Sequence, residues 1–477
     1  MSFASPLFLW YFTPIVLVAV LICPRSWRNG IVATASLIFY AAGAGPSTLL
    51  LLVCMVVNFL AGPLLEPDEW NLARSRRRWV LIGAIAVDLG VLVVWKYAGF
   101  FTQQLEGFAR LLGGDFPVVH LALPIGISFY TFHHISYVVD IYRGERPALR
   151  NPVSFVTYIA MFPQLIAGPI VRYREIADQL PQHRTHPLDD IASGFPRFAL
   201  GLCKKVIIAD SLSPIVDACF ATPSDQMTFA IAWLGAITYT LQLYFDFSGY
   251  SDMAIGLGRM LGFRLPENFA RPYSSVTVTE FWRRWHMSLS RWFRDYVYIP
   301  LGGNRRGAAR TYRNLIIVFT LTGLWHGANW TFLVWGLYHG ALLIVERGYR
   351  REAAPRSRRS LITRRTLTMA LVIFGWVIFR APELPDALTM IGHMLLPDFD
   401  GLTDVVAAAV TNQRLIILLA ALAVFFLPAH PVTGPLLESS RSRPAAILRV
   451  TIMTGGLLYA AILIATGTFS PFLYFQF

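Results

Sequence analysis

Two histidines lie in segments whose composition could support acid–base chemistry. His326 falls within the apolar segment 321–340, between Trp325 and Gly327. A histidine held in surroundings of low polarity is neutral at pH 7 and can act as a general base. Gly323 and Gly327 carry no side chain, so a substrate or a second helix can approach the imidazole closely. Taken alone, such a residue is more often a hydrogen-bonded core histidine than a catalyst.

His286 falls within the segment 280–296, which is rich in both arginine and aromatic residues. At 100° per residue, a helix over this segment gathers its arginines on one side and its aromatic residues on the other. His286 lies at the edge of the aromatic face. Such a helix is typical of the membrane interface rather than of a membrane crossing. Its arginines serve either as anchors to lipid phosphates or as ligands for an anionic cytosolic substrate, such as the phosphates of a coenzyme.

Two aspartates and a further histidine are assigned structural roles. Asp246 and Asp252 lie among aromatic residues and glycines, but their spacing matches no metal-binding motif. The favoured interpretation is that they pair with Arg259 or with other cations inside a helical bundle. His339 is expected to be a buried structural histidine rather than a catalytic one.

Two other stretches interrupt the apolar sequence in the middle of the chain. The segment 123–144, which contains His133 and His134, has the pattern of a polar-lined membrane segment. The segment 162–173 contains two prolines and Gly168, which predict a broken or re-entrant helix. Because ionisable groups inside a membrane are costly and usually functional, we expect the chemistry to lie in the middle of the chain.

The elements that must position these residues are membrane helices. Of the 477 residues, 55% are hydrophobic and 14% are charged, and the mean hydropathy is +0.52. Soluble domains carry about 25% charged residues. Apolar runs approach the roughly 20 residues that a bilayer helix needs, so roughly ten to thirteen membrane segments are expected. The runs lie near 7–23, 30–44, 46–62, 79–98, 117–139, 153–170, 226–245, 314–333, 366–381, 412–429 and 448–468.

The net charge of +13 does not indicate nucleic-acid binding. The arginines cluster in short loops beside apolar runs, for example at 74–78 and 347–365, which is the pattern of cytoplasmic loops in membrane proteins. Assigning these clusters to the cytoplasm places the N-terminus outside. Residues 100–116, residues 382–411 and the C-terminal tail then also lie outside.

The first apolar run lacks a basic leader region and a small-residue cleavage site, so we expect a retained helix. The four cysteines form no Cys-x-x-Cys pair, so neither a disulfide framework nor a zinc site is expected, and no metal is needed. Composition suggests three parts. Residues 1–345 form a membrane core, 346–365 a basic cytoplasmic loop, and 366–477 the C-terminal transmembrane helices with an extracytoplasmic tail.

Five ordered segments resemble the membrane-bound O-acyltransferase family, and in particular its bacterial branch that serves alginate O-acetylation. The resemblance covers about residues 1–345 and weakens afterwards; Glu280, where an aspartate is expected, is a conservative departure. It implies an all-α polytopic membrane protein, a helical bundle with a central tunnel and with re-entrant and interfacial amphipathic helices. The five segments are PIGISFYTFHHISYVVDIYR, FPQLIAGPIVRY, YFDFSGYSDMAIGLGRMLGF, FWRRWHMSLSRWFRDYVYIPLGGNR and LTGLWHGANWTFLVWGLYHG.

The same resemblance implies an acyl transfer with His326 as the embedded catalytic histidine and His286 as the second histidine. The donor would be a cytosolic acyl thioester, expected to be acetyl-CoA, with no bound cofactor. Arg283, Arg284 and Trp285 are the candidate residues for binding this donor. The acetyl group would pass outward across the bacterial inner membrane, to a periplasmic acetyltransferase partner or directly to a surface polysaccharide such as alginate. The sequence leaves the polymer open.

The C-terminal segment SPFLYFQF, residues 470–477, offers a candidate acyl acceptor. It resembles the Phe-x-Tyr-x-x-Phe ending of a small partner protein in lipoteichoic acid D-alanylation, whose tyrosine is thought to carry the acyl group. Phe472, Tyr474 and Phe477 match this pattern. A phenol has a pKa near 10, so its ester is a better acyl donor than an alkyl ester. The alternative is an apolar tail resting at the membrane interface.

Two other classes of function remain open at this point. Broken helices and intramembrane charges are also typical of transporters, although the sequence shows no inverted repeat and no clear relay partner for His326. A scaffold that only recruits a soluble acetyltransferase is the third interpretation. Turnover of a thioester by the purified protein distinguishes an acyltransferase from both.

Overall fold

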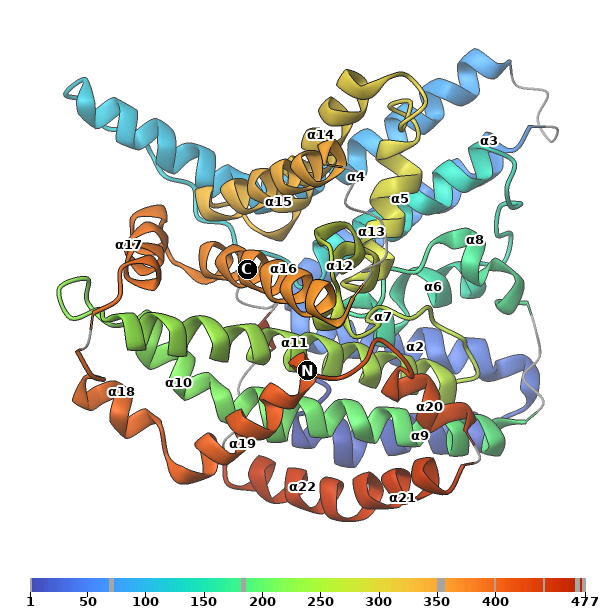
Figure 1. Cartoon of the computed structure of the whole chain (residues 1–477). Coiled ribbons are helices and arrows are strands. Elements are labelled where there is room, and N and C mark those ends of the chain that lie inside the picture. The colour runs from blue at the N-terminus through green and yellow to red at the C-terminus, as the bar shows by residue number, and fades with distance from the viewer. Residues whose placement is uncertain are drawn as a thin grey trace. The chain divides into compact units, whose positions relative to one another are not determined.

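The computed structural model describes residues 2–67, 73–181, 186–349, 357–398, 400–440, 442–467 and 472–473. Within these ranges the chain forms helices, turns and irregular segments and no strand, which confirms the prediction of an all-α protein (Figure 1). The chain divides into two compact units. The first is Met1–Phe195 with Ala254–Pro266, and the second is Pro196–Met253 with Glu267–Phe477.

The first unit is built from long apolar helices followed by short ones. A left-handed Gly45 (φ 54°) and the following Pro46 separate the second helix from the third, as expected where a helix must end and restart. The helices are α1 (Thr13–Ile22), α2 (Arg28–Ala44), α3 (Thr48–Leu65), α4 (Arg74–Leu111), α5 (Ile127–Tyr142), α6 (Pro152–Ala160), α7 (Phe162–Leu165) and α8 (Tyr173–Ile176).

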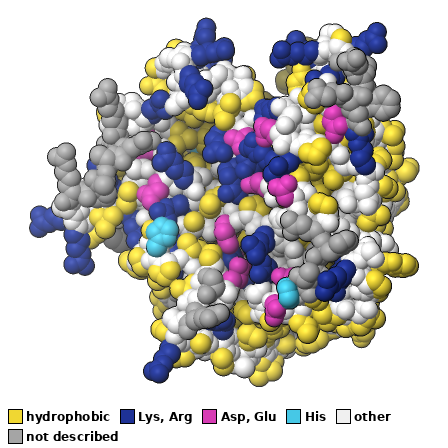
Figure 2. Space-filling view, turned by 90° about the vertical axis from the view of Figure 1, so that its right-hand side faces the viewer, with side chains coloured by type: hydrophobic (Ala, Val, Ile, Leu, Met, Phe, Trp, Pro, Cys, Tyr) yellow, Lys and Arg dark blue, Asp and Glu magenta, His cyan; other side chains and the backbone are white. Residues whose placement is uncertain are grey.

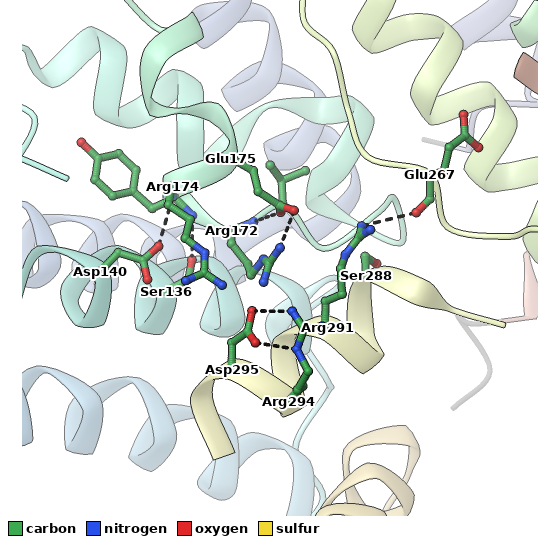
Figure 3. A network of polar contacts seen from close by, with 12 residues as sticks. Ser136, Asp140, Arg172, Arg174, Glu175, Glu267, Ser288, Arg291, Arg294 and Asp295 are labelled. Atoms are coloured by element: carbon green, nitrogen blue, oxygen red, sulfur yellow. Dashed lines mark hydrogen bonds and ion pairs between the residues drawn. The ribbon is translucent and has the colours of Figure 1, made fainter. Parts of the chain in front are cut away.

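The predicted break in the segment 162–173 is confirmed, because α6 and α7 are two short helices and residues 166–172 are not helical. The predicted apolar run near 117–139 is only partly a helix, since α5 begins at Ile127. At the start of α8, the side chain of Arg172 forms an ion pair of 2.6 Å with Glu175 (Figure 3). These irregular segments belong to the first unit.

The second unit contains the remaining helices, including the parts of α9 and α11 that lie on its side of the division between the units. Its helices are mostly shorter, and three π-helical turns interrupt them at Lys204–Ala209, Arg294–Tyr298 and Ile452–Gly456. The helices are α9 (Pro187–Cys203), α10 (Asp210–Phe220), α11 (Phe229–Met260), α12 (Val278–Arg284), α13 (Met287–Phe293), α14 (Ala308–His326), α15 (Trp330–Gly348), α16 (Arg358–Arg380), α17 (Leu384–Leu395), α18 (Asp404–Ala409), α19 (Asn412–Leu422), α20 (Thr433–Ser439), α21 (Arg443–Thr451) and α22 (Leu457–Ala465).

Four helical stretches among the described residues are long and apolar enough to cross a membrane: Arg25–Leu65, Arg74–Leu111, Arg358–Arg380 and Arg443–Ala465. Two shorter apolar helical stretches, Phe8–Ile22 and Asn412–Phe425, add to them. The other expected segments are helices that are short or carry many polar residues, so they do not meet this criterion.

The surface supports contact with lipid. Large apolar side chains are exposed on the candidate spans and on the first helix, for instance Leu49 (66%), Leu111 (84%) and Ile22 (77%). On one face, Lys and Arg side chains gather with Asp and Glu near the centre, and hydrophobic side chains lie along the margins (Figure 2). Extended apolar exposure of this kind marks a membrane or partner surface rather than a water-exposed one.

Candidate active site

His326 is the last residue of α14, at the turn of a helical hairpin. Gly327 follows it in an extended conformation (φ −166°), which ends the helix, and α15 begins three residues later at Trp330. The side chain of Asn329 accepts a hydrogen bond of 3.1 Å from the backbone amide of Thr331 and so caps α15. The apolar run predicted near 314–333 is therefore two helices rather than one membrane segment.

Close contact between the two helices of this hairpin depends on glycine. A methyl group at Gly323 would lie 2.3 Å from the carbonyl oxygen of Phe332, and one at Gly336 would lie 2.3 Å from the carbonyl oxygen of Phe319. A methyl group at Gly327 would overlap the ring of Phe332 at 2.1 Å. The flanking glycines thus allow a second helix to approach His326, one of the two roles that the sequence suggested for them.

The imidazole of His326 is buried, with 6% of the residue exposed, in an aromatic surrounding. Its ring centroid lies 5.0 Å from that of Trp325, 5.1 Å from that of Trp335 and 5.1 Å from that of Phe379. These contacts come from both helices of the hairpin and from α16. A site walled by aromatic rings excludes water and strengthens any electrostatic interaction inside it.

The prediction of one continuous amphipathic helix over 280–296 is wrong. The segment breaks into α12 and α13, and His286 between them adopts a left-handed conformation (φ 43°) that is uncommon for a non-glycine residue. At the break, backbone groups of α12 and α13 form hydrogen bonds to residues that precede the segment. The amide of Met287 donates to the carbonyl of Asn268, and the carbonyl of Arg284 accepts from the amide of Ala270.

His286 is held by Asn268. The Oδ1 atom of Asn268 lies 3.2 Å from His286 Nδ1 and also accepts hydrogen bonds from the backbone amide and the hydroxyl of Ser288. Because this oxygen can only accept, the neutral ring must carry its proton on Nδ1, which leaves Nε2 unprotonated. His286 is 1% exposed and lies outside the candidate spans, and burial lowers its pKa to about 3. The ring is therefore neutral at physiological pH.

Trp325 connects the two histidines. Its ring centroid lies 5.9 Å from that of His286 and 5.0 Å from that of His326, which is its neighbour in sequence. The two imidazoles thus contact the same indole, although they belong to different helical segments.

A cavity of about 580 Å³ opens beside these elements in the second unit. Four arginines line it: Arg283, Arg291, Arg294 and Arg347. Arg283, Arg294 and Arg347 are exposed, whereas Arg291 is half-buried. Figure 3 shows Arg294 paired with Asp295 at 2.7 Å, and Arg291 donating to the backbone oxygen of Glu267 at 3.4 Å. The cavity is strongly cationic and its size suits a small-molecule ligand.

The inner wall of this cavity approaches His326. Thr322 and Phe319 of α14 line it together with Trp282 of α12. Thr322 precedes His326 by four residues, so their side chains lie one above the other on the same face of the helix. A ligand that fills the cavity would therefore end within one helical turn of the catalytic candidate.

The three residues suggested for donor binding lie in different environments. Arg283 lines the cavity. Arg284 instead forms an ion pair of 2.8 Å with Glu280 and donates to the carbonyl of Ala270. Trp285 is buried, and its ring lies 4.9 Å from that of Trp376. The other cavity arginines, which were not singled out, could have been found in the sequence: Arg291 and Arg294 share the arginine face of 280–296.

His339 lies in an aromatic box deeper in the hairpin. It is fully buried, and its Nδ1 accepts a hydrogen bond of 3.4 Å from the indole of Trp282. The rings of Trp335 and Trp282 lie 5.2 Å and 5.1 Å from it. These contacts are those expected of the structural histidine that the sequence suggested.

The two aspartates pair with cations, as favoured from the sequence, but Arg259 is not the partner of Asp246. Asp246 pairs with Lys205 at 2.9 Å, and Lys205 also pairs with Asp210 at 2.5 Å. Arg259 instead lies 3.7 Å from Asp190. Asp252 accepts from both Arg197 (2.7 Å) and Lys204 (2.6 Å), so it is fully compensated.

Two described residues of the C-terminal segment, Phe472 and Leu473, pack against α11. The backbone amide of Leu473 donates a hydrogen bond of 2.9 Å to Asp246, and the fully buried Phe472 stacks on Tyr250 at 4.3 Å. Phe247 lies 6.0 Å from Phe472 and 4.7 Å from His286, measured between ring centroids. Tyr474 and Phe477 lie outside the described residues.

Comparison with known proteins identifies the class. The model of the membrane-bound O-acyltransferase family matches residues 143–383, which contain both histidines and the cavity. The chain belongs to this family and is a multi-pass membrane O-acyltransferase with an all-helical fold. Family membership separates it from the transporter and the scaffold that the sequence alone left open.

Within the family, the similarity is to enzymes that modify cell-surface polymers. The chain is 45% identical, over the full length of both chains, to a protein of Azotobacter vinelandii described as a probable alginate O-acetylase. It is 36% identical to the peptidoglycan O-acetyltransferase of Helicobacter pylori, covering 82% of this chain and 79% of the relative. It is 29% identical to the teichoic acid D-alanyltransferase of Bacillus subtilis, covering 54% of this chain and 68% of the relative.

Proposed function

We propose that the chain transfers an acetyl group from cytosolic acetyl-CoA across the bacterial inner membrane for O-acetylation of an extracytoplasmic polysaccharide. The observation that carries the proposal is the arginine-lined cavity whose inner wall reaches Thr322, one turn from His326. The relatives described as an alginate O-acetylase and a peptidoglycan O-acetyltransferase favour an acetyl group and a polymeric acceptor. Alginate is the polymer named for a relative that matches over its full length.

The cavity supports the choice of donor. A coenzyme thioester carries several phosphates at one end and a reactive carbonyl at the other. Arginine binds phosphate through a planar fork of donors, and Arg283, Arg294 and Arg347 supply such forks at the exposed end. The apolar wall formed by Trp282 and Phe319 suits the thinner, uncharged arm that leads to the thioester.

The neutral imidazole of His326 acts as the general base. It accepts the proton of an acceptor hydroxyl, whose oxygen attacks the thioester carbonyl carbon. The carbon–sulfur bond then breaks, an oxygen ester forms, and the imidazolium returns the proton to the leaving thiolate. The reaction balances without a metal or an oxidant. His286, which contacts the same indole, orients the groups around the donor carbonyl.

The acceptor hydroxyl is that of Tyr474. Support comes from the anchoring of the tail just before it, where Leu473 bonds to Asp246 and Phe472 packs beside Phe247. Phe247 in turn contacts His286. The acetylated phenol would then pass its group to a periplasmic acetyltransferase partner, or directly to the polysaccharide.

Release of free coenzyme A by the purified protein tests the proposal. With acetyl-CoA as donor, His326→Ala should abolish thiol release, because no other group replaces the base at this position. The matched control is His120→Ala, since His120 is exposed on a non-helical segment of the first unit. Equal thiol release by the wild type and the His326 variant would overturn the assignment, as would loss of release in the His120 variant alone.

The same variants test the acceptor in cells. Surface polysaccharide from a strain that carries His326→Ala should contain no acetyl ester, while His120→Ala should leave the acetyl content unchanged. Membrane insertion, measured by the amount of protein in the membrane fraction, must be equal for both variants. A strain that keeps full acetylation with His326→Ala would contradict the proposed function.

A further inference from the structure

A groove of about 1500 Å³ lies in the first unit, apart from the machinery described above. One side of it is apolar. Ile15 and Ala19 of α1 and Ala35 and Ile38 of α2 line it, each pair spaced as neighbours on one helical face. Both helices belong to apolar stretches that are candidates for the membrane interior. An apolar flank on such helices suits hydrocarbon chains.

The other end of the groove is basic. Arg25 lies in the short turn Arg25–Trp27 between the two helices, and Arg146 and Arg150 approach from the segment before α6. Two carboxylates oppose them: Asp178 pairs with Arg146 at 2.6 Å, and Glu66 pairs with Arg150 at 2.5 Å.

Three arginines against two carboxylates leave a surplus of one positive charge at this end. Asp178 is also largely exposed, with 69% of its side chain accessible, so its pairing with Arg146 is screened by water. With Arg146 and Arg150 paired to carboxylates, the surplus charge is that of Arg25, which is exposed. This end can therefore accept an added anion.

The apolar side and the basic end of the groove together indicate the chemical class of its ligand. An apolar flank along two membrane helices requires one or more hydrocarbon chains, and a cluster of arginines at the loop end requires an anionic head group. Arginines in short loops beside apolar helices are typical of the cytoplasmic face of a membrane protein. Trp27 is 68% exposed beside Arg25, as is typical of tryptophan at the level of lipid head groups.

We propose that this groove is a binding site for one anionic glycerophospholipid of the cytoplasmic leaflet. Its phosphate contacts Arg25 and Arg146, and one acyl chain lies along Ala19 and Ala35. Basic pockets between membrane helices on this side are known to hold anionic head groups. The volume exceeds the roughly 300–1,000 Å³ of small-molecule pockets, which also favours a lipid over a free metabolite.

The test uses the full chain, purified in neutral detergent, and native mass spectrometry to count bound lipid. Phosphatidylglycerol and phosphatidylcholine with identical chains are offered at equal concentration. Wild-type protein should retain phosphatidylglycerol about tenfold better, equivalent to about 1.4 kcal/mol. The double variant Arg25→Gln/Arg146→Gln should lose this preference. A matched variant, Arg78→Gln, removes an exposed arginine of α4 that does not line the groove, and should keep it.

A second pair of variants tests the apolar flank without changing charge. Gly30 lines the groove and has no atom within 4 Å of an added side-chain carbon, so Gly30→Phe fills the groove without a clash at that carbon. It should reduce retention of phosphatidylglycerol about tenfold. Gly83→Phe in α4 is the control, since Gly83 also faces open space and lies outside the groove.

Three outcomes would overturn the proposal: equal retention of the two lipids, unchanged retention in the Arg25/Arg146 double variant, or unchanged retention in Gly30→Phe. Two soluble competitors distinguish other anionic ligands. If glycerol 3-phosphate or coenzyme A displaces phosphatidylglycerol at equal concentration, the groove recognises a free phosphate compound and not a lipid.

Discussion

The backbone amide of Leu473 donates a hydrogen bond of 2.9 Å to the carboxylate of Asp246. This contact joins two positions more than two hundred residues apart, and it lies one residue before the candidate acceptor Tyr474. The bond is buried, because Asp246 is 1% exposed and Leu473 is 7% exposed. The tail is therefore anchored by a specific polar contact as well as by aromatic packing.

If the tail carries the acetyl group, Tyr474→Phe should eliminate polymer acetylation, because the substitution removes only the hydroxyl. Phe472→Ala should reduce acetylation severalfold, since it removes the ring that stacks on Tyr250. Gln476→Ala is the matched tail variant and should remain active. Acetyl ester released from surface polysaccharide is the measurement. Full acetylation with Tyr474→Phe would exclude the relay without excluding His326 as the base.

The ion pairs of Lys205 and Lys204 should differ sharply in their contribution to the free energy of unfolding. Lys205→Met leaves the buried Asp246 and Asp210 without their shared cation, so the free energy of unfolding should fall by about 3–5 kcal/mol. Lys204→Met should cost less, because Asp252 keeps its pairing with Arg197. Thermal unfolding in detergent, followed by tryptophan fluorescence, compares the two. Equal losses would mean that Lys205 is not the central cation of this cluster.

The contact at Gly336 should be intolerant of even one methyl group. Gly336→Ala places a carbon 2.3 Å from the carbonyl oxygen of Phe319, so α14 and α15 must separate. We expect a loss of about 1–3 kcal/mol in stability together with loss of activity, because His326 would move. Gly83→Ala in α4 meets no neighbour and should instead gain about 0.5–1 kcal/mol. A stable, active Gly336→Ala protein would show that the hairpin is not closely packed in the membrane.

Substitutions of the cavity arginines should change KM for acetyl-CoA without changing kcat. Arg283→Gln and Arg294→Gln should raise KM for acetyl-CoA and leave kcat nearly unchanged, because they bind the phosphates in both the ground state and the transition state. A charge-assisted contact of this kind contributes about 1.5–3 kcal/mol. Arg284→Gln should change KM less, since Arg284 does not line the cavity. The reverse order, with Arg284 dominant, would place the phosphates elsewhere.

Burial of His286 predicts a pH dependence of folding. In the unfolded chain a histidine has a pKa near 6.5, whereas burial lowers the pKa of His286 to about 3 in the folded protein. Below pH 6.5 the unfolded chain therefore binds more protons, and stability falls as the pH falls towards 3. The slope from this residue is at most about 1.4 kcal/mol per pH unit.

His286→Asn isolates this term, because asparagine tolerates the left-handed conformation at this position. Between pH 6.5 and pH 4 the wild type should lose stability more steeply than the variant. Other buried histidines contribute to both proteins and cancel in the difference. Parallel curves would show that His286 is accessible to protons in the folded state.

Much of the fold was predictable because membrane helices are specified by long apolar runs. The runs near 79–98 and 366–381 correspond to α4 and α16, and the prolines near 162–173 predicted the break between α6 and α7. The close helix packing beside His326 was also predictable, through the glycines that flank it. The cavity arginines were partly predictable, because Arg291 and Arg294 share one face of the pattern at 280–296.

The break at His286 was not predictable from local sequence. Nothing in the segment 280–296 disfavours a helix, and the arginine and aromatic faces fit one continuous helix well. The break depends on residues 268–270, which precede the segment. Their backbone groups form hydrogen bonds with the backbone of Arg284 and Met287. The partner of Asp246 was missed for a related reason, since Lys205 lies in a π-helical turn that shifts its direction.

The glycine contact between the two helices of the hairpin has a consequence for how this sequence can vary. Gly323 fixes the position of α14 against α15, and His326 follows it by three residues. One residue inserted between them would rotate His326 by about 100° around the helix axis and turn it away from Thr322 and the cavity. A change in length between Gly323 and His326 therefore cannot be absorbed. The position of His326 relative to the cavity therefore depends on the number of residues that separate it from Gly323.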